Sequence, residues 1–226
     1  MTGRCRPIAT AAVLAGALAG CGLIPGGRTP ERPPRSASPA HPGISRPDTA
    51  QCLAGLGATG AAYAPLPDRF HAPGCQAVGS VRLDRLAGDR GEFVLANLGP
   101  VTCPVARAFA GWARFGVDRA ARQMLGSGLA RIETMGSYSC RNVAGTGRLS
   151  AHARAEAIDI GAFVLADGRR VSVKAGWNGA NDQERAFLRT VHASACKRFG
   201  TVLGPAYNAA HADHLHVEPG SGSFCR

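Results

Sequence analysis

Two short segments of the chain carry residue types that bind metal ions and move protons. Residues 150–159 contain a histidine and an aspartate, and residues 211–216 contain three of the chain's seven histidines. A zinc ion takes about four ligands in tetrahedral geometry, and a catalytic site leaves one position for water. We therefore predict that His152, Asp159 and His216 provide three ligands to one mononuclear zinc ion.

The local pattern favours this assignment. Residues two apart on a strand share a face, so His214 and His216 should point into one cleft while Leu215 and Val217 face the core. One histidine of the pair can then bind metal while the other transfers protons. Asp159 lies between two isoleucines, where an ionised carboxylate is costly to bury without a cation or strong hydrogen bonds.

Each segment alone is a weak signal. A His-x-His pair arises by chance, and a half-buried aspartate is usually satisfied by backbone donors or an arginine. The occurrence of both segments in one domain favours a metal site over the alternative, a disulfide-stabilised domain without metal. His192 lies beside an apolar helical stripe and carries no ligand signal.

The surrounding pattern predicts two helices and a sheet. Apolar residues recur at spacings of three and four over residues 104–125 and 182–199, which end at Gly126 and Gly200. Strands are expected over residues 132–139, 157–165, 170–174 and 215–217. Asp167-Gly168 predicts a hairpin between the second and third strands. The expected fold class is α+β, a single domain with a mainly antiparallel sheet flanked by helices.

The N-terminal region predicts export. Two arginines precede a short apolar run that ends at Leu18-Ala19-Gly20-Cys21, so we interpret residues 1–20 as a lipoprotein signal peptide and Cys21 as the lipidated residue. An ordinary signal peptide with a chance cysteine is the alternative. Residues 21–51 are rich in proline and predict a disordered tether, and residues 52–226 form the domain.

Export implies an envelope location and an oxidising compartment. We expect the domain on the periplasmic face, held to the membrane only by lipid, and we prefer the outer membrane because Gly22 offers no inner-membrane retention signal. Up to three disulfides are expected, and fifteen connectivities are possible. We favour a pair between Cys52 and Cys75. The six cysteines of the domain are Cys52, Cys75, Cys103, Cys140, Cys196 and Cys225.

The formal net charge is +11, and Lys174 and Lys197 are the only lysines. A basic surface attracts polyanions such as cell-wall or lipid phosphates and carboxylates, although an arginine-rich genome gives the same composition. The sequence lacks basic residues interleaved with aromatic ones and has no nucleic-acid motif. We therefore expect no nucleic-acid partner, and we expect a monomer.

The two segments resemble known zinc peptidases. The pattern S-x-H-x-x-x-x-A-x-D followed by H-x-H resembles the superfamily of lysostaphin-type enzymes, D-Ala-D-Ala metallopeptidases and hedgehog domains. Over residues 52–225 the chain more closely resembles the bacterial extensin-like C-terminal domain family. The stretches that carry this closer resemblance are GSYSCRN (136–142), AIDI (157–160), ACKRF (195–199), TVLGP (201–205) and NAAHADHLH (208–216).

This resemblance implies a hedgehog- and D-Ala-D-Ala-peptidase-like fold with Zn²⁺ bound to the residues proposed above. It places His214 at the general-base position. Arg141 would polarise a substrate carbonyl or bind a terminal carboxylate, and His211 would line the cleft. The implied activity is a zinc-dependent endopeptidase or carboxypeptidase acting on peptidoglycan stem peptides or cross-links.

One departure favours a second interpretation. Superfamily peptidases usually have glycine where this chain has Ala155, and Glu156 adds a charge beside it. If that position needs a positive φ, alanine costs on the order of 1 kcal/mol there and shifts His152. The alternative function is therefore a non-catalytic, zinc-stabilised lipoprotein that binds peptidoglycan or has a structural role.

Overall fold

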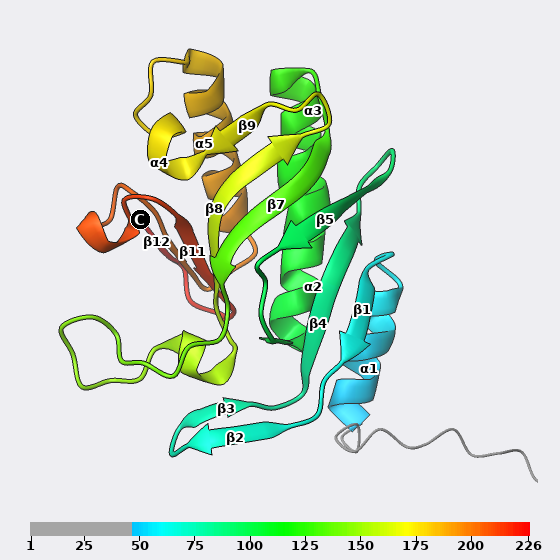
Figure 1. Cartoon of the computed structure of the whole chain (residues 1–226), viewed down its shortest axis with the longest axis vertical. Helices are drawn as coiled ribbons and strands as arrows, with labels where there is room; N and C mark the ends of the chain where they lie inside the picture. Colours follow the sequence, from blue (N-terminus) through cyan, green and yellow to red (C-terminus); the bar gives the residue numbers. More distant parts are fainter. Residues whose placement is uncertain (1–46) are drawn as a thin grey trace, which may run out of the picture. The chain divides into compact units, whose positions relative to one another are not determined.

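The computed structural model describes residues 47–226 (Figure 1). The predicted signal peptide, Cys21 and residues 21–46 of the predicted tether lie outside this described part. Helix α1 (Pro47–Gly57) begins five residues before the domain boundary that we placed at Cys52. Among the helices of residues 47–226, none combines the length and apolar character needed to cross a bilayer.

The predicted α+β class, with one mainly antiparallel sheet, is confirmed. The ten-stranded sheet has the order β1-β4-β5-β7-β8-β11-β10-β12, with β6 beside β4 and β9 beside β8. Within the described residues, β5–β7 and β10–β12 are parallel pairs and the other pairs are antiparallel. The sheet contains β1 (Ala62–Pro65), β4 (Ser80–Ala87), β5 (Glu92–Ala96), β6 (Val101–Thr102), β7 (Leu129–Gly136), β8 (Ile158–Leu165), β9 (Arg170–Ser172), β10 (Thr201–Leu203), β11 (Leu215–Glu218) and β12 (Phe224–Cys225).

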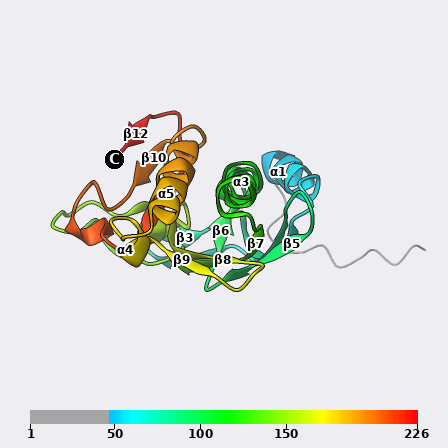
Figure 2. The same cartoon turned by 90° about the horizontal axis from the view of Figure 1, so that it is seen from above.

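The main helices cover one face of this sheet, as Figure 2 shows for α1, α3 and α5. Trp112 is fully buried between helix and sheet, and its indole Nε1–H donates to the carbonyl of Val191 at 3.0 Å. Phe163 of β8 packs edge-on against Phe187 of α5. The helical elements are α2 (Cys103–Trp112), the π-helix η1 (Ala113–Asp118), α3 (Arg119–Leu125), η2 (Ala151–Arg154), α4 (Val173–Gly176), α5 (Asp182–Ala195) and η3 (Ala209–His211).

The helix predicted over residues 104–125 is confirmed as the continuous segment α2-η1-α3. Gly126 ends it in the left-handed conformation, with φ of 74°. The π-helical turn in its middle was not predicted, because apolar spacing does not report a local change in hydrogen-bond pattern. Within that turn, a Cβ on Gly116 would lie 2.2 Å from Ser194 Oγ, so glycine permits the close approach of α5.

The helix predicted over residues 182–199 is four residues too long. It begins as expected, with Asn181 Oδ1 accepting from the backbone N–H groups of Gln183 and Glu184. It ends at Ala195 because the chain must turn into β10 at Thr201. The apolar spacing continued past this end because Phe199, outside the helix, is also buried.

Each of the four predicted strands is present with shifted ends, as β7, β8, β9 and β11, whereas the other eight strands of the described residues were not predicted. The hairpin at Asp167-Gly168 is confirmed, and β8 pairs with β9 across it. The strand predicted over residues 132–139 instead spans Leu129–Gly136. The strand predicted over residues 170–174 ends at Ser172, whose hydroxyl accepts from the N–H of Ala175 and starts α4.

All six cysteines of the domain form disulfides, but the predicted pair between Cys52 and Cys75 is wrong. Cys52 lies on α1, which packs against the start of α2, whereas Cys75 belongs to the separate hairpin β2 (Arg69–Ala72) and β3 (Cys75–Ala77). Proximity in sequence therefore does not predict which cysteines form disulfides here. The observed bonds are Cys52–Cys103, Cys75–Cys140 and Cys196–Cys225.

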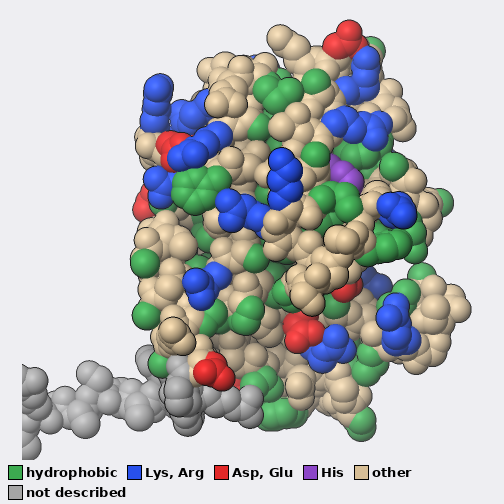
Figure 3. Space-filling view, turned by 180° about the vertical axis from the view of Figure 1, so that it is seen from behind, with side chains coloured by type: hydrophobic (Ala, Val, Ile, Leu, Met, Phe, Trp, Pro, Cys, Tyr) green, Lys and Arg blue, Asp and Glu red, His purple; other side chains and the backbone are tan. Residues whose placement is uncertain are grey.

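Basic side chains are spread over the outer surface of the molecule on the side where the helices lie. Figure 3 shows Lys and Arg at several separate places on this face, between hydrophobic and acidic side chains. Some of these arginines are paired, as in the contacts of Arg114 and Arg119 with Asp89. The positive charge is thus distributed and partly neutralised locally.

Candidate metal centre

Strand register brings two of the predicted ligands together. Strands β8 and β11 pair in antiparallel fashion, and His216 lies directly opposite Asp159. Side chains of such opposed residues lie on one face with Cβ atoms about 5 Å apart. The carboxylate and the imidazole are therefore neighbours because of the pairing of the two strands, although 57 residues separate them in sequence.

His152 reaches the same point from the one-turn helix η2. Ser150 caps this turn by accepting from the N–H of His152 at 3.4 Å. The segment after β7 fixes the residue from both sides, because the Ser137 carbonyl accepts from His152 Nδ1 at 2.6 Å and the Ser139 N–H donates to the His152 carbonyl at 3.1 Å. Residues 137–139, which we had assigned to a strand, therefore anchor the third ligand.

The three side chains present their donor atoms to one point. His152 Nε2 lies 3.2 Å from His216 Nδ1 and 3.2 Å from Asp159 Oδ2, and His216 Nδ1 lies 2.7 Å from Asp159 Oδ1. Tetrahedral ligands about 2.05 Å from zinc are separated by roughly 3.3 Å. The two 3.2 Å spacings from His152 are close to this value, and the 2.7 Å contact between His216 and Asp159 would have to lengthen for a metal ion to bind.

The hydrogen bonds behind the two imidazoles leave the correct nitrogens free for metal. A carbonyl can only accept, so His152 Nδ1 carries a proton and Nε2 has a lone pair. His216 Nε2 lies 2.8 Å from Glu218 Oε1, so the ionised carboxylate assigns the proton to Nε2 and frees Nδ1. Two lone pairs and a carboxylate then face one another, an arrangement that could hold a metal ion.

The pKa values of Asp159 and His216 also favour a positive charge in the metal-free cluster. Burial disfavours the carboxylate of Asp159, but its contacts with the imidazoles of His152 and His216 outweigh burial and hold the pKa of Asp159 well below its usual range. Burial also disfavours the charged form of His216, yet hydrogen bonds to Asp159 and Glu218 raise its pKa to about 9. Without metal, the cation is therefore a proton on His216.

His214 lies beside the ligands and has one ring nitrogen free. Its Nδ1 is 2.9 Å from Asp213 Oδ1, and its Nε2 is 3.5 Å from Asp159 Oδ1. The contact with Asp213 therefore engages Nδ1 of His214 and leaves Nε2 directed toward the cluster. His214 is 9% exposed, so it is shielded from bulk water while it still lines a cleft. This is the geometry that a general base requires.

A cleft of about 510 Å³ reaches this cluster at His214 and His216, which line it. His211 lines it, with its ring centroid 5.1 Å from that of His214. Burial first, and then repulsion from His214 and His216, lowers the pKa of His211 to about 4, so its imidazole is neutral at neutral pH. Arg141 and Arg148 also line the cleft and are exposed. Arg141 is thus placed over the cleft but makes no side-chain hydrogen bond or ion pair with any residue in the described part.

Sequence reasoning missed three residues that support the site. Glu218 continues the alternation of His214 and His216, so the period of two on β11 was a usable signal for it. Asp213 directly precedes His214 and was also visible in the sequence. Ser137 contributes through its backbone carbonyl, and no side-chain pattern reports such a contact.

Ala155 adopts the positive φ that is unfavourable for alanine. It is left-handed, with φ of 56°, and it is fully buried at the end of η2. Its N–H still donates to the His152 carbonyl at 3.1 Å. His152 nevertheless reaches the other two ligands, so alanine at this position does not displace the imidazole.

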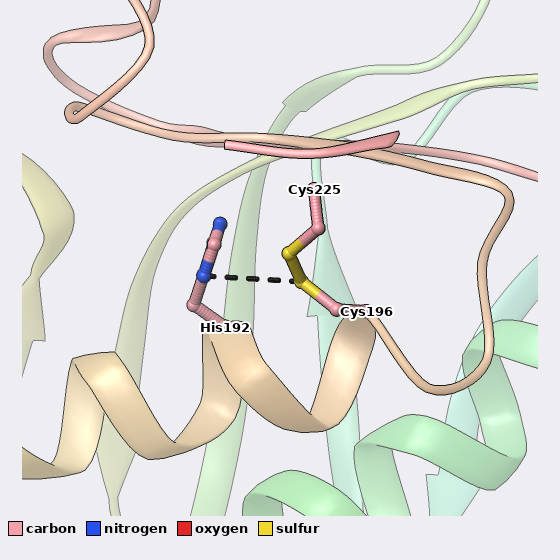
Figure 4. Close-up of side chains that lie close together, drawn as sticks. All are labelled: His192, Cys196 and Cys225. Carbon is pink, nitrogen blue, oxygen red and sulfur yellow. Dashed lines mark hydrogen bonds between the residues drawn. A yellow bond between two sulfur atoms is a disulfide. The ribbon is translucent and has the colours of Figure 1, made fainter. Parts of the chain in front are cut away.

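A second group of potential ligand atoms comprises His192, Cys196 and Cys225 (Figure 4). His192 Nδ1 lies 3.9 Å from Cys196 Sγ on the same face of α5. The two sulfur atoms are joined in a disulfide, so neither is available as a thiolate. His192 Nε2 lies 3.1 Å from the Arg226 carbonyl, in keeping with a structural role.

Comparison with known proteins identifies a family for the chain. The family model described as Extensin-like protein C-terminus matches residues 50–226, which is most of the chain. No curated protein and no solved structure matches significantly.

Proposed function

Because the chain belongs to the extensin-like protein C-terminus family over residues 50–226, we propose that it is a zinc-dependent hydrolase of the cell envelope. The proposed reaction is cleavage of peptide bonds in peptidoglycan stem peptides or cross-links. The observation that carries the proposal is the convergence of His152, Asp159 and His216 beside His214, at the base of a cleft. Kinship with the zinc peptidase superfamily is part of this proposal.

Each residue has a distinct role in the proposed reaction. Zinc, when bound, supplies a Lewis acid that activates water and polarises a carbonyl oxygen. His214 Nε2 accepts the proton of the attacking water and later returns it to the leaving amine. Asp213 holds the Nδ1 proton of His214, so that Nε2 stays in the accepting form. His211, which is neutral at neutral pH, lines the cleft and can form a hydrogen bond with the substrate.

The charge of the cleft suits an acidic peptide. Arg141 and Arg148 face the cleft from the loop that follows Cys140. Within the described residues, neither guanidinium is paired with a carboxylate. A stem peptide carries carboxylates, and guanidinium groups bind these in bidentate fashion. The specific role of Arg141 is therefore recognition of a substrate carboxylate or carbonyl.

The proposed location follows from the N-terminal sequence. Residues 1–20 would direct export, Cys21 would carry the lipid, and the proline-rich segment would span from the membrane to the domain. We propose a monomer on the periplasmic face, preferentially at the outer membrane. In this arrangement the cleft can bind peptidoglycan while the lipid is the only attachment of the protein to the membrane.

The deciding experiment separates chemistry from metal binding. We expect His214→Ala to retain one zinc ion per chain and to lose at least a hundredfold in the release of soluble fragments from purified peptidoglycan. Metal content is measured by elemental analysis and fragments by mass spectrometry. His192→Ala, which removes a half-buried histidine outside the cleft, is the matched control and should keep full activity. Wild-type rates in zinc-loaded His214→Ala would contradict the proposal.

The second candidate function is a zinc-stabilised module without catalysis. One observation favours it: the three ligands come from η2, β8 and β11, so a metal ion would cross-link three separate segments. That stabilisation needs no reaction. Zinc in the wild-type protein with no product from intact peptidoglycan would select this module over the hydrolase.

A further inference from the structure

Two exposed aromatic side chains, Tyr207 and Phe224, line the same cleft as His214. They are 42% and 43% exposed, whereas most large apolar side chains of residues 47–226 are buried. The other exposed phenylalanines of the described residues, Phe70 and Phe115, lie outside the cleft. Exposed apolar surface that is gathered in a cleft indicates a binding site, so this aromatic pair points to a ligand that covers it.

Ring contacts connect the aromatic pair to the proposed general base. The Tyr207 ring packs edge-on against Phe224, with centroids 5.7 Å apart, and its centroid lies 5.6 Å from that of His211. The His211 ring in turn lies 5.1 Å from that of His214. Two ring contacts therefore separate Tyr207 from His214. A few residues of an extended peptide, each about 3.5 Å long, cover such a span.

The backbone and a disulfide hold both rings in place. Phe224 belongs to β12, which pairs with β10, and the next residue, Cys225, is bonded to Cys196 at the end of α5 (Figure 4). Tyr207 lies in the turn after β10, where its N–H donates to the Gly204 carbonyl at 2.9 Å. Groups that are already fixed lose little conformational freedom when a ligand binds. The aromatic pair is thus a prepared surface.

Polar groups lie beside these rings and are free to bind a ligand. His211 Nδ1 is 2.7 Å from Asn208 Oδ1, so this contact engages one end of the Asn208 amide. Within the described residues, neither the Nδ2 group of Asn208 nor the hydroxyl of Tyr207 makes a hydrogen bond. Both residues are exposed, and both line the cleft. The open apolar surface is therefore bordered by donors and acceptors of hydrogen bonds.

This combination matches a pyranose ring. One face of such a sugar consists of C–H groups, which pack against the negatively charged face of an aromatic ring. Its rim carries hydroxyl groups, and in amino sugars acetamido groups, which bind to side chains such as the Tyr207 hydroxyl and the Asn208 amide. An aliphatic side chain would cover the rings but would leave these polar groups without partners.

We infer that Tyr207, Phe224 and Asn208 form a subsite for an amino-sugar ring of the peptidoglycan glycan strand. The sugar packs on the aromatic pair, and the stem peptide attached to it runs past His211 to His214. The inference rests on the proposed function for the identity of the natural ligand, and it deepens that function by naming the substrate as glycan-linked peptide. Sugar binding itself does not require the metal ion.

The first experiment measures sugar binding by the full chain in the presence of a metal chelator, so that no hydrolysis takes place. The probe is N,N′-diacetylchitobiose, which has two amino-sugar rings and no peptide. NMR shifts are followed for the backbone amides of residues 207–208 and 224–225. A free stem tetrapeptide is titrated in parallel. We expect the disaccharide, and not the tetrapeptide, to shift these amides.

Variants of the aromatic pair test its role in this binding. Tyr207→Ala and Phe224→Ala should each weaken disaccharide binding about tenfold, the loss expected for roughly 50–60 Å² of apolar contact. Tyr207→Phe keeps the ring and should lose less than Tyr207→Ala. Phe70→Ala, which removes an exposed ring outside the cleft, is the matched control and should bind like the wild type. Melting temperatures check folding, and Tyr207→Ala decides the question if Phe224→Ala does not fold.

The second experiment measures hydrolysis by the zinc-loaded protein. A stem peptide linked to its disaccharide is compared with the same peptide freed of sugar. We expect the wild type to have the higher kcat/KM for the linked substrate. Tyr207→Ala should lose this preference and keep the wild-type rate on the free peptide, because the ring contacts only the sugar.

The two experiments separate failure of the subsite from failure of the proposed function. The sugar subsite is overturned if the disaccharide leaves these amides unshifted, if it binds Tyr207→Ala as tightly as the wild type, or if only the tetrapeptide shifts them. Hydrolysis of both substrates without disaccharide binding would keep the proposed function and reject the subsite. Disaccharide binding as expected, with hydrolysis of neither substrate, would keep the subsite and contradict the proposed function.

Discussion

Glu218 decides which nitrogen of His216 faces the candidate metal centre. Its carboxylate lies 2.8 Å from His216 Nε2 and is half-buried, so it fixes both the proton and the ring orientation. Burial opposes ionisation of Glu218, but the hydrogen bond with His216 outweighs burial and lowers the pKa of its carboxyl group. A carboxylate behind a ligating histidine increases the basicity of the imidazole.

At this residue scale we predict that Glu218→Gln weakens zinc binding by roughly ten- to hundredfold. The amide oxygen of glutamine can still accept from Nε2–H but lacks the negative charge. Affinity is measured by competition with a chromophoric chelator. Glu156→Gln, which removes a carboxylate paired with Arg154 on the surface, is the control and should bind zinc like the wild type. An unchanged affinity in Glu218→Gln would show that Glu218 does not tune the site.

At the scale of elements, the cleft depends on a loop that contains no helix or strand. Residues 141–149 run from Cys140 to the start of η2, with an isolated bridge between Asn142 and Leu149. They carry Arg141 and Arg148 to the cleft. The Cys75–Cys140 disulfide fixes one end of this loop to the hairpin β2–β3, and η2 fixes the other.

We predict that replacing Cys75 and Cys140 with serine lowers the free energy of unfolding by about 2–4 kcal/mol. It should also speed trypsin cleavage after Arg141 and Arg148, because the loop loses its attachment. Urea unfolding and timed proteolysis with mass spectrometry measure the two effects. Replacing Cys52 and Cys103 is the control: it opens a loop of similar length and should cost similar stability without faster cleavage at these arginines. Equal cleavage in both variants would argue against a local role for the disulfide.

At the scale of the whole molecule, the metal centre links folding to pH. The pKa of His216 is about 9 in the folded, metal-free protein and about 6.5 in an unfolded chain. The folded state therefore binds its proton more tightly, and this contribution is fully present below about pH 6.5 and is lost as pH rises toward 9. Asp159 has a lowered pKa, so its contribution is present above about pH 4 and is lost in stronger acid.

We predict that the chelated protein loses on the order of 1–3 kcal/mol of unfolding free energy between about pH 6.5 and pH 9. With zinc the trend should reverse, because the metal displaces the proton and binds more tightly as pH rises. Urea unfolding across this range, with chelator and with excess zinc, measures both. His216→Gln should remove the slope of the chelated protein. A slope that persists in this variant would assign the pH dependence to other groups.

The sequence by itself determined those features that arise from local pattern. Apolar spacing located the helix of residues 104–125 and the start of α5, and Asp167-Gly168 located a hairpin. Period-two alternation predicted that His214 and His216 lie near one cleft, and they do, with His216 on β11 and His214 directly before it. The burial expected for Asp159 marked it as a ligand candidate. These features depend on neighbours a few residues away, which the sequence displays directly.

Tertiary structure alone decided how distant segments meet. The partners of Cys52 and Cys75, the register that sets His216 opposite Asp159, and the Ser137 carbonyl behind His152 all depend on contacts between segments tens of residues apart. Backbone groups and side-chain directions form these contacts only after the sheet and its covering helices have packed, so no local spacing in the sequence encodes them.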